Sequence, residues 1–153
     1  MKILCDILDK KEIKYDWYVL GTSYKKEELE EISGLFRNNK NVHFLGYKQN
    51  VYQYIKKMDY LALLTDRESW GLVITEALIL GIPCITTNFT GLEKQIINNE
   101  NGIIIEMENN NNEYEEKIED VINLKQQLKN NVKCKNYSRE KIIDIWLNLL
   151  KNS

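Results

Sequence analysis

Residues 66–87, DRESWGLVITEALILGIPCITT, form the most informative stretch of the chain. They follow a short apolar run at 60–64 and contain a polar loop, a glycine, an apolar helical segment and a second apolar run at 83–86. Two short apolar runs joined by a helix are typical of neighbouring parallel strands that are covered by their connecting helix. The stretch therefore predicts one βα unit of an α/β fold.

The same alternation continues on both sides of this unit. We expect strands at 16–21, 42–45, 60–64, 83–86 and 102–105, and helices at 1–13, 25–37, 51–58, 72–80 and 92–98. Strands that alternate with helices in this way predict a doubly wound, Rossmann-like parallel sheet with helices on both faces. The sequence is thus expected to form an α/β core over residues 1–108.

The pattern changes after the core. Four asparagines at 109–112 predict a solvated loop, because asparagine favours turns and left-handed backbone. Two helices without an intervening strand are expected at 113–131 and 138–150, within a C-terminal helical part at 113–153. With 153 residues in total, the chain has the length of one domain.

Composition excludes several classes of protein. The chain has 21 Lys and Arg against 23 Asp and Glu, a net charge of −2, and no basic block, so a nucleic-acid partner is not expected. Its apolar runs, such as 77–82 and 102–105, are far shorter than the roughly 18 residues that span a bilayer. These features predict a soluble globular domain.

The histidine and cysteine content limits which catalytic groups and which cellular compartment we expect. The chain has one histidine, His43, between Val42 and Phe44 in strand-like sequence, so a structural role is favoured over a catalytic one. Three widely spaced cysteines and no signal-peptide pattern predict a reducing, cytoplasmic location. A histidine-rich metal site is not expected.

Candidate binding groups gather where the strand at 60–64 ends, the place at which open α/β sheets bind ligands. The backbone N–H groups of Gly71, Leu72 and Val73 begin a helix and favour an anion such as phosphate. Glu76, one turn later, is suited to the two hydroxyls of a ribose, and Glu68 in the loop is suited to the hydroxyls of a sugar. The alternative is that both glutamates are solvated surface residues.

The eight-residue spacing of Glu68 and Glu76 does not by itself decide between these interpretations. The same spacing recurs at Glu100 and Glu108 and at Glu108 and Glu116, where no such loop and helix surround it. A short motif is only a hypothesis until its context supports it. The surrounding motifs therefore have to carry the assignment.

Those motifs form an ordered series: Thr65-x-x-Glu68-Ser69-Trp70-Gly71-Leu72-Val73-x-x-Glu76-Ala77, then Gly81-Ile82-Pro83-Cys84-Ile85, Gly91 and Asn101-Gly102. The series resembles the nucleotide-sugar-binding lobe of the retaining glycosyltransferases of family four, which have the two-lobed GT-B fold. The resemblance covers residues 16–150, nearly the whole chain. It implies the second lobe of that fold.

The resemblance also implies roles for individual residues. Glu68 is expected to lie beside the donor sugar as the candidate catalytic residue, and Glu76 to bind the donor ribose. Sugar hydroxyls or the diphosphate are expected to be contacted by the segment Ser69, Trp70, Gly71, Leu72 and Val73. Gly46 and Tyr47 are weaker candidates near the base, and Tyr47 is equally well read as a surface aromatic residue. No metal is expected, and the donor would be a nucleoside diphosphate sugar.

The chain departs from this family's pattern in two respects. Gln95 stands where a carboxylate is common. The first strand of the lobe, with a Gly-Arg loop and a later lysine that neutralise the departing diphosphate, has no counterpart, and the nearby replacements are Lys48, Arg67 and Lys94. That strand is central in the family, between those expected at 16–21 and 60–64. We therefore expect the sheet either to close across the gap or to take a strand from another chain.

The leading functional hypothesis is the donor-binding part of a hexosyltransferase of polysaccharide biosynthesis. It would transfer a sugar with retention from a nucleoside diphosphate sugar to a glycan or lipid-linked acceptor. The chain alone is expected to be inactive, with an N-terminal lobe or another chain as partner, and the complete enzyme to associate peripherally with a membrane. The alternatives are a non-catalytic nucleotide-sugar-binding or interaction module that complements a separate lobe, and a remnant that binds nothing.

Overall fold

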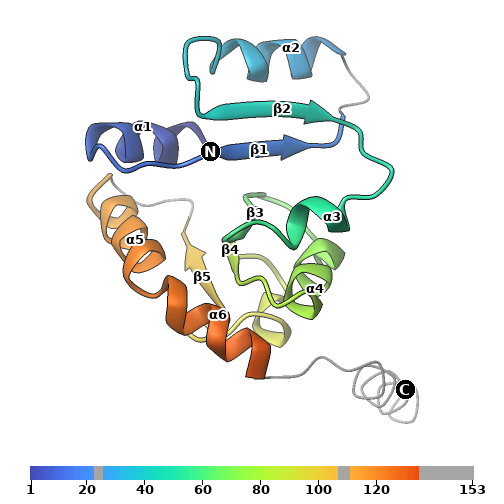
Figure 1. Ribbon diagram of the computed structural model, residues 1–153, viewed down its shortest axis with the longest axis vertical. Coiled ribbons are helices and arrows are strands. Elements are labelled where there is room, and N and C mark those ends of the chain that lie inside the picture. Colours follow the sequence, from blue (N-terminus) through green and yellow to red (C-terminus); the bar gives the residue numbers. More distant parts are fainter. Residues whose placement is uncertain (23–25, 107–110, 135–153) are drawn as a thin grey trace. The chain divides into compact units, whose positions relative to one another are not determined.

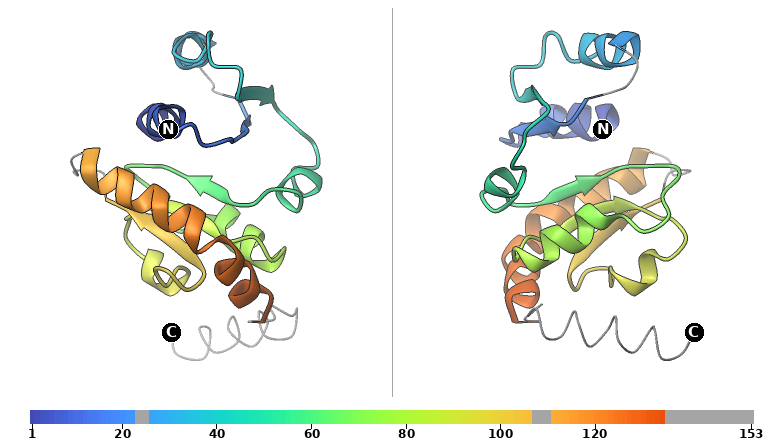
Figure 2. Two further views of the ribbon diagram at one scale, coloured as in Figure 1. Left: turned by 60° about the vertical axis from the view of Figure 1, so that its left-hand side comes forward. Right: turned by 90° about the vertical axis from the view of Figure 1, so that its right-hand side faces the viewer.

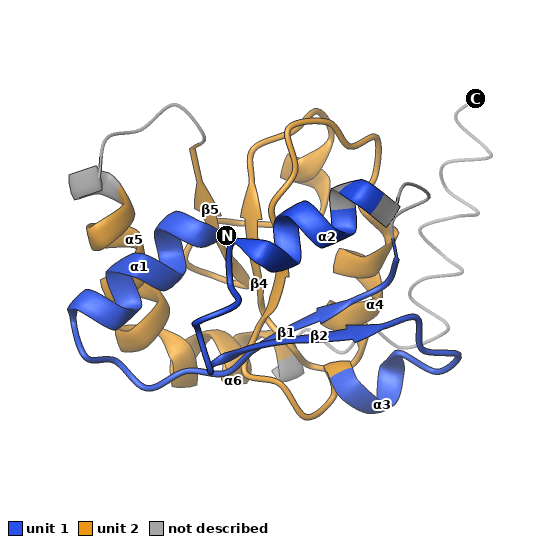
Figure 3. Ribbon diagram, turned by 90° about the horizontal axis from the view of Figure 1, so that it is seen from above, with its two compact units in different colours: residues 1–54 blue, residues 55–153 orange. Residues whose placement is uncertain are grey.

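The computed structural model describes residues 1–22, 26–106 and 111–134. It divides the chain into two compact units, Met1–Tyr54 and Ile55–Ser153, which Figure 3 shows in separate colours. Each unit contains its own parallel sheet. The α/β class and the parallel pairing of the strands, both predicted from the sequence, are confirmed.

The first unit is built on two strands (Figure 1). Strand β1 (Trp17–Leu20) pairs in parallel with β2 (Val42–Gly46), and the register shifts between Val19 and Leu20. Three helices accompany them: α1 (Lys2–Lys10), α2 (Lys26–Gly34) and α3 (Tyr52–Ile55), the last of which ends at the first residue of the second unit.

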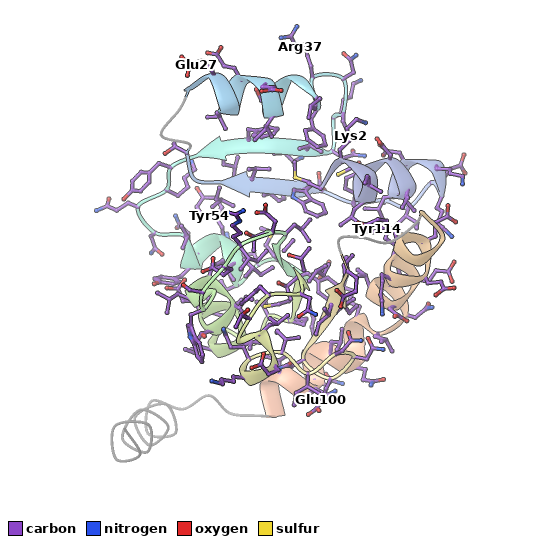
Figure 4. All side chains as sticks on the ribbon, turned by 180° about the vertical axis from the view of Figure 1, so that it is seen from behind. Lys2, Glu27, Arg37, Tyr54, Glu100 and Tyr114 are labelled. Atoms are coloured by element: carbon purple, nitrogen blue, oxygen red, sulfur yellow. The ribbon has the colours of Figure 1, made fainter. Side chains whose placement is uncertain are left out.

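Buried apolar side chains of this unit come from α1 and from the segment that follows α2. Leu4, Cys5 and Ile7 of α1 are buried, whereas Ile3 is 47% exposed. Phe36, which follows α2, is buried with its ring centroid 6.1 Å from that of Phe44 in β2. The exposed side chains of Glu27 and Arg37 point away from the sheet, as Figure 4 shows.

The second unit has three parallel strands in the order β3-β4-β5. These are β3 (Leu61–Leu63), β4 (Cys84–Thr87) and β5 (Gly102–Ile105), and between them come α4 (Leu72–Ile79) and the short 3₁₀ helix η1 (Leu92–Lys94). Helices α5 (Asn111–Asn123) and α6 (Lys125–Cys134) follow. The two views of Figure 2 show α4 on one face of this sheet and α5 and α6 on the other.

The central strand β4 organises this unit. All four of its residues are buried, because a neighbouring strand lies on each side and helices cover both faces. Its neighbour β5 approaches so closely that a Cβ atom at Gly102 would lie 2.6 Å from the carbonyl oxygen of Cys84. Glycine at position 102 therefore permits the pairing of β4 with β5.

The prediction of a helix at 92–98 is wrong, because only one 3₁₀ turn forms there. The side chain of Asn101 replaces the helical hydrogen bonds that would continue it. Its Oδ1 accepts from the backbone nitrogen of Ile97 at 2.8 Å, and its Nδ2 donates to the carbonyl oxygen of Gln95 at 2.8 Å. Asparagine side chains compete with the helical backbone in this way.

Other expected boundaries also need correction. The first helix ends at Lys10 rather than at residue 13. Glu12, inside the expected helix, adopts a left-handed φ of 54°. The helix expected at 51–58 is confined to α3. The single helix expected at 113–131 is two helices interrupted at Leu124, and the first of them begins at Asn111, so half of the expected loop at 109–112 is helical. The helix expected at 138–150 lies outside the described residues.

The two strands beside the expected gap are both edge strands in the described part of the chain. Strand β1 pairs with β2 and strand β3 pairs with β4, but β1 and β3 do not pair with each other. The expected closure of the sheet by direct pairing across the gap is therefore not found. Pairing with a strand of another chain stays a prediction. Among the described helices, none has the length and apolar character needed to cross a bilayer.

Candidate functional site

The loop that follows β3 is fixed at its start by the neighbouring strand β4. The backbone nitrogen of Thr65 donates to the hydroxyl of Thr87 at 2.9 Å, and that hydroxyl donates to the carbonyl oxygen of Thr65. The hydroxyl of Thr65 in turn donates to the carbonyl oxygen of Arg67 at 2.8 Å. We call residues 65–71 the donor loop, after the sugar donor that the sequence leads us to expect at the start of α4.

Gly71 ends the donor loop and caps α4 in a left-handed conformation, with φ 56° and ψ 59°. A Cβ atom there would meet the side chains of Leu63, Ile74 and Phe89, each at 3.2 Å. No side chain caps this helix end. The N–H groups of its first turn, including those of Leu72 and Val73, are thus oriented as an anion-binding helix start.

The carboxylate of Glu68 folds back onto its own loop. Its Oε1 accepts from the backbone nitrogen of Ser69 at 2.8 Å and from that of Trp70 at 3.4 Å. These backbone hydrogen bonds, of Ser69 first and then of Gly71 and Trp70, lower the pKa of Glu68 below its ordinary value. Glu68 is therefore ionised at neutral pH, with one carboxylate oxygen directed at the backbone of its own loop.

A cavity of about 680 Å³ lies between the donor loop and the loop that follows β4. It is lined by Asp66, Arg67, Glu68, Ser69, Asn88, Phe89 and Thr90. These residues come from the carboxyl ends of two adjacent parallel strands, where open α/β sheets bind ligands. Carboxylates, hydroxyls, an amide and one guanidinium give it the hydrogen-bonding groups that a polyhydroxylated ligand requires.

The structure brings only some of the sequence-predicted site residues into this cavity. Glu68 and Ser69 line it, whereas Glu76 does not and is half-buried in the middle of α4. Trp70 lies in the donor loop with 37% of its surface exposed. Gly71 is the N-cap of α4, and Leu72 and Val73 are its first two residues, so their role in binding stays a prediction.

Gly46 and Tyr47 belong to the first unit. Gly46 is the last residue of β2 and has a φ of 66°, and its carbonyl oxygen accepts from the nitrogen of Gly21 at 3.0 Å. The side chain of Tyr47 is 73% exposed. An exposed ring fits both interpretations of Tyr47, as a base-contacting residue and as a surface aromatic residue.

Sequence reasoning missed Asp66 at the start of the cavity lining and four residues at and after the end of β4. Asn88, Phe89 and Thr90 line the cavity from the loop after β4, and Thr87 fixes the donor loop. Their positions directly after an apolar run were the available signal, since that is where a second parallel strand delivers its loop to the same edge of the sheet.

Comparison with known proteins identifies the family to which this chain is similar. A family model described as glycosyl transferases group 1 matches residues 2–141. The capsular polysaccharide biosynthesis glycosyltransferase CapM of Staphylococcus aureus is 33% identical over 106 residues, which are 69% of this chain and 28% of CapM. The N-acetyl-alpha-D-glucosaminyl L-malate synthase of Bacillus anthracis is 36% identical over 74 residues, 44% of this chain and 19% of the synthase.

Solved structures agree on the fold. The crystal structure of Anabaena HepE in complex with UDP superposes on the whole of this chain with a TM-score of 0.76 and 19% sequence identity, and the match covers 45% of HepE. At that level of identity the likeness concerns the GT-B fold alone. This chain spans less than a third of the two curated relatives and less than half of HepE.

Proposed function

Because this chain belongs to the family of glycosyl transferases group 1, we propose that it is the donor-binding part of a glycosyltransferase. The enzyme would transfer a sugar, with retention at the anomeric carbon, from a nucleoside diphosphate sugar to a glycan or lipid-linked acceptor. The observation that carries the proposal is the cavity at the ends of β3 and β4, which contains the ionised Glu68 and adjoins the uncapped start of α4.

The cavity suits the sugar of the donor. We assign Glu68 to its hydroxyls, because an oriented carboxylate accepts two or more hydrogen bonds from a sugar ring. Ser69 and the exposed ring of Trp70 lie beside Glu68 in the donor loop and supply further contacts. A glutamate held in one direction by its own loop can orient the donor without a large entropic cost.

The start of α4 suits the diphosphate. The N–H groups of Leu72 and Val73, with the positive end of the helix dipole, would stabilise the negative charge that grows on the diphosphate as the sugar leaves, whereas the N–H of Gly71 interacts with the carboxylate of Glu68. Glu76, one turn further along α4, is assigned to the ribose hydroxyls. Gly46 and Tyr47 remain the candidates for the base. The UDP in the HepE structure supports a nucleotide ligand for this fold.

Leaving-group stabilisation also needs cations. Of the three basic residues considered from the sequence, Arg67 lines the cavity, Lys94 is exposed at the end of η1 and Lys48 belongs to the first unit. We propose Arg67 as this chain's contribution, with further cations and the acceptor site supplied by an N-terminal lobe or by another chain. That no metal takes part stays a prediction from the family resemblance; within the described ranges, no three His, Cys, Asp or Glu residues gather as ligands.

We place the reaction in the cytoplasm, with peripheral attachment of the complete enzyme to a membrane where its acceptor is lipid-linked. The buried free thiols of Cys5 and Cys84 support a reducing compartment. The names of the relatives, which include a capsular polysaccharide enzyme, support a surface polysaccharide as the product.

Thermal unfolding of the 153-residue chain in the presence of UDP, GDP, ADP and their glucose and mannose conjugates tests the proposal. Ligand at about a hundred times its dissociation constant should add ~2.7 kcal/mol to the free energy of unfolding. The shift should disappear in Glu76→Ala and persist in Glu93→Ala, which removes an exposed carboxylate from η1.

The outcomes separate the candidate functions. A shift with one base that depends on Glu76 supports a working donor site, and transfer of sugar after addition of a separate lobe then distinguishes the enzyme from a non-catalytic binding module. A cooperatively folded chain that shifts with none of these ligands contradicts the proposal and favours the remnant.

A further inference from the structure

Gln95 is a buried polar residue directly after η1, with 9% of its surface exposed. It does not line the cavity. Both ends of its side-chain amide are used: Nε2 donates to the carbonyl oxygen of Trp70 in the donor loop, and Oε1 accepts from the hydroxyl of Thr75 in α4 at 2.9 Å. One side chain thus joins η1 to the loop and to the helix that follow β3.

The backbone at Gln95 is itself held in place by buried neighbours. The carbonyl oxygen of Gln95 accepts from Nδ2 of Asn101, a residue that is 1% exposed, and the next residue, Ile96, is 2% exposed. A buried side chain on a buried backbone has little freedom to follow movements of the loop. The loop must therefore adapt to Gln95.

The contact with Trp70 has a geometric consequence for the next residue. The carbonyl group of Trp70 and the N–H group of Gly71 belong to one peptide unit, which is planar and trans, so they point in opposite directions. By holding this carbonyl, Gln95 directs the Gly71 N–H away from itself. That N–H is one of the three backbone groups that interact with the carboxylate of Glu68.

Neither an ionised carboxylate nor an apolar side chain satisfies both partners at position 95. A carboxylate would place an acceptor oxygen against the Trp70 carbonyl, and a leucine would leave that carbonyl without its donor. This gives a physical reason for glutamine at a position where the family resemblance leads one to expect a carboxylate.

We propose that Gln95 is a positioning residue for donor binding: its amide orients the Trp70–Gly71 peptide and, through the Gly71 N–H, the carboxylate of Glu68. The role in binding rests on the function proposed above, whereas the role in orienting the loop does not.

Hydrogen exchange of the ligand-free chain, followed by mass spectrometry, tests the orientation. In Gln95→Leu the amides of residues 68–71 should exchange about tenfold faster or more, because the partly buried carbonyl of Trp70 loses its donor, while β4 and β5 keep their protection. The matched control is Gln126→Leu, which removes an exposed glutamine that donates to Asn130 in α6. Thr75→Val removes only the hydroxyl that orients the amide, and it should give a smaller increase in the same segment.

Gln95→Glu distinguishes a hydrogen bond from packing, because protonation of the new carboxyl group should restore the lost donor while the size of the side chain stays the same. Above its pKa the carboxylate repels the Trp70 carbonyl, but the protonated acid has the shape of glutamine and a hydroxyl that can donate. The excess exchange of residues 68–71, measured against wild type at each pH, should therefore be large at pH 8 and fall toward pH 5. Burial raises the pKa of such a carboxyl group, which extends the rescue to higher pH.

Binding of UDP-glucose by the same variants completes the test. Affinity should fall about tenfold in Gln95→Leu, and also in Gln95→Glu at pH 8. The affinity of Gln95→Glu should recover at pH 5. Gln126→Leu should bind as wild type does. Unchanged exchange at 68–71 in Gln95→Leu and Thr75→Val overturns the orientation, as does a Gln95→Glu variant that stays impaired at pH 5. A wild-type chain that binds no nucleotide sugar, while the exchange pattern holds, overturns the proposed function and the role in binding but leaves the orientation supported.

Discussion

The hydroxyl of Thr87 is hydrogen-bonded to both backbone polar atoms of Thr65, accepting from its nitrogen at 2.9 Å and donating to its carbonyl oxygen. Thr87 is the last residue of the central strand β4, and its surface is 2% exposed. Thr65 is the first residue of the donor loop. One buried side chain therefore fixes the point at which the loop leaves the sheet.

Thr87→Val is expected to lower the free energy of unfolding by about 1–3 kcal/mol, because it keeps the shape of the side chain but leaves two backbone groups without their partner. Thr90→Val, at an exposed position three residues after the end of β4, should change it by less than about 0.5 kcal/mol. Urea unfolding of both variants measures the difference. Equal stabilities would show that the Thr87 hydroxyl contributes nothing to the loop.

Gly71→Ala is expected to lower the free energy of unfolding by about 1–2 kcal/mol from the left-handed backbone alone. Contacts at 3.2 Å with three buried or half-buried side chains add to this cost. Gly34→Ala is the control: it lies at the end of α2 with open space around its Cβ position, and it should be neutral or stabilise by up to about 1 kcal/mol. A Gly71→Ala variant as stable as wild type would mean that the start of α4 relaxes freely.

The strands of the second unit could be predicted closely from the sequence. Residues 102–105 were expected as a strand and form β5, and the helix expected at 72–80 ends one residue earlier. Short apolar runs bounded by Gly71, Gly81 and Gly102 carry this information locally, since glycine and apolar periodicity both act within a few residues. The position of Glu68 and Ser69 at the ends of the strands followed from the same pattern.

Other features depend on partners that are distant in sequence. The helix expected at 92–98 stops early because Asn101 hydrogen-bonds to two backbone groups of that segment, and no periodicity reveals this choice. The hydrogen bonds between Thr65 and Thr87 could not be predicted without knowing the register of β3 against β4. The contribution of Asn88 and Thr90 to the cavity has the same origin, because it requires knowledge of which loops adjoin.

Glu68→Gln and Glu76→Gln should show which part of the donor each glutamate binds. If Glu76 holds the ribose, its variant should weaken UDP and UDP-glucose alike, by about five- to a hundredfold, as expected for loss of a charge-assisted hydrogen bond. If Glu68 holds the sugar, its variant should weaken UDP-glucose more than UDP. Calorimetric titration measures all four affinities. Equal weakening of both ligands by Glu68→Gln would contradict its placement at the sugar.

Asp59→Asn probes an ion-pair cluster that connects α6 to the segment before β3. The Asp59 carboxylate accepts from Lys125 at 2.6 Å and from Lys129 at 2.5 Å. Burial alone would raise the pKa of Asp59, but the hydrogen bonds and charges of the two lysines outweigh it and lower the pKa below its ordinary value. Because the side chain of Asp59 is 54% exposed, we expect the variant to lose at most about 1 kcal/mol at pH 7.

The pH dependence of that loss has a definite sign. A carboxylate whose pKa is lower in the folded than in the unfolded state stabilises the fold fully above the unfolded value, about 3.9, and the contribution disappears as the pH falls through the folded value. The difference in free energy of unfolding between wild type and Asp59→Asn should therefore be constant from pH 7 to about 5 and shrink below about pH 4. Added salt should reduce it at pH 7, since the pairs are partly exposed. Urea unfolding at pH 7, 5, 4 and 3, with Glu93→Gln as the exposed-carboxylate control, measures the effect, and a difference that grows on acidification would contradict the stabilising role of this cluster.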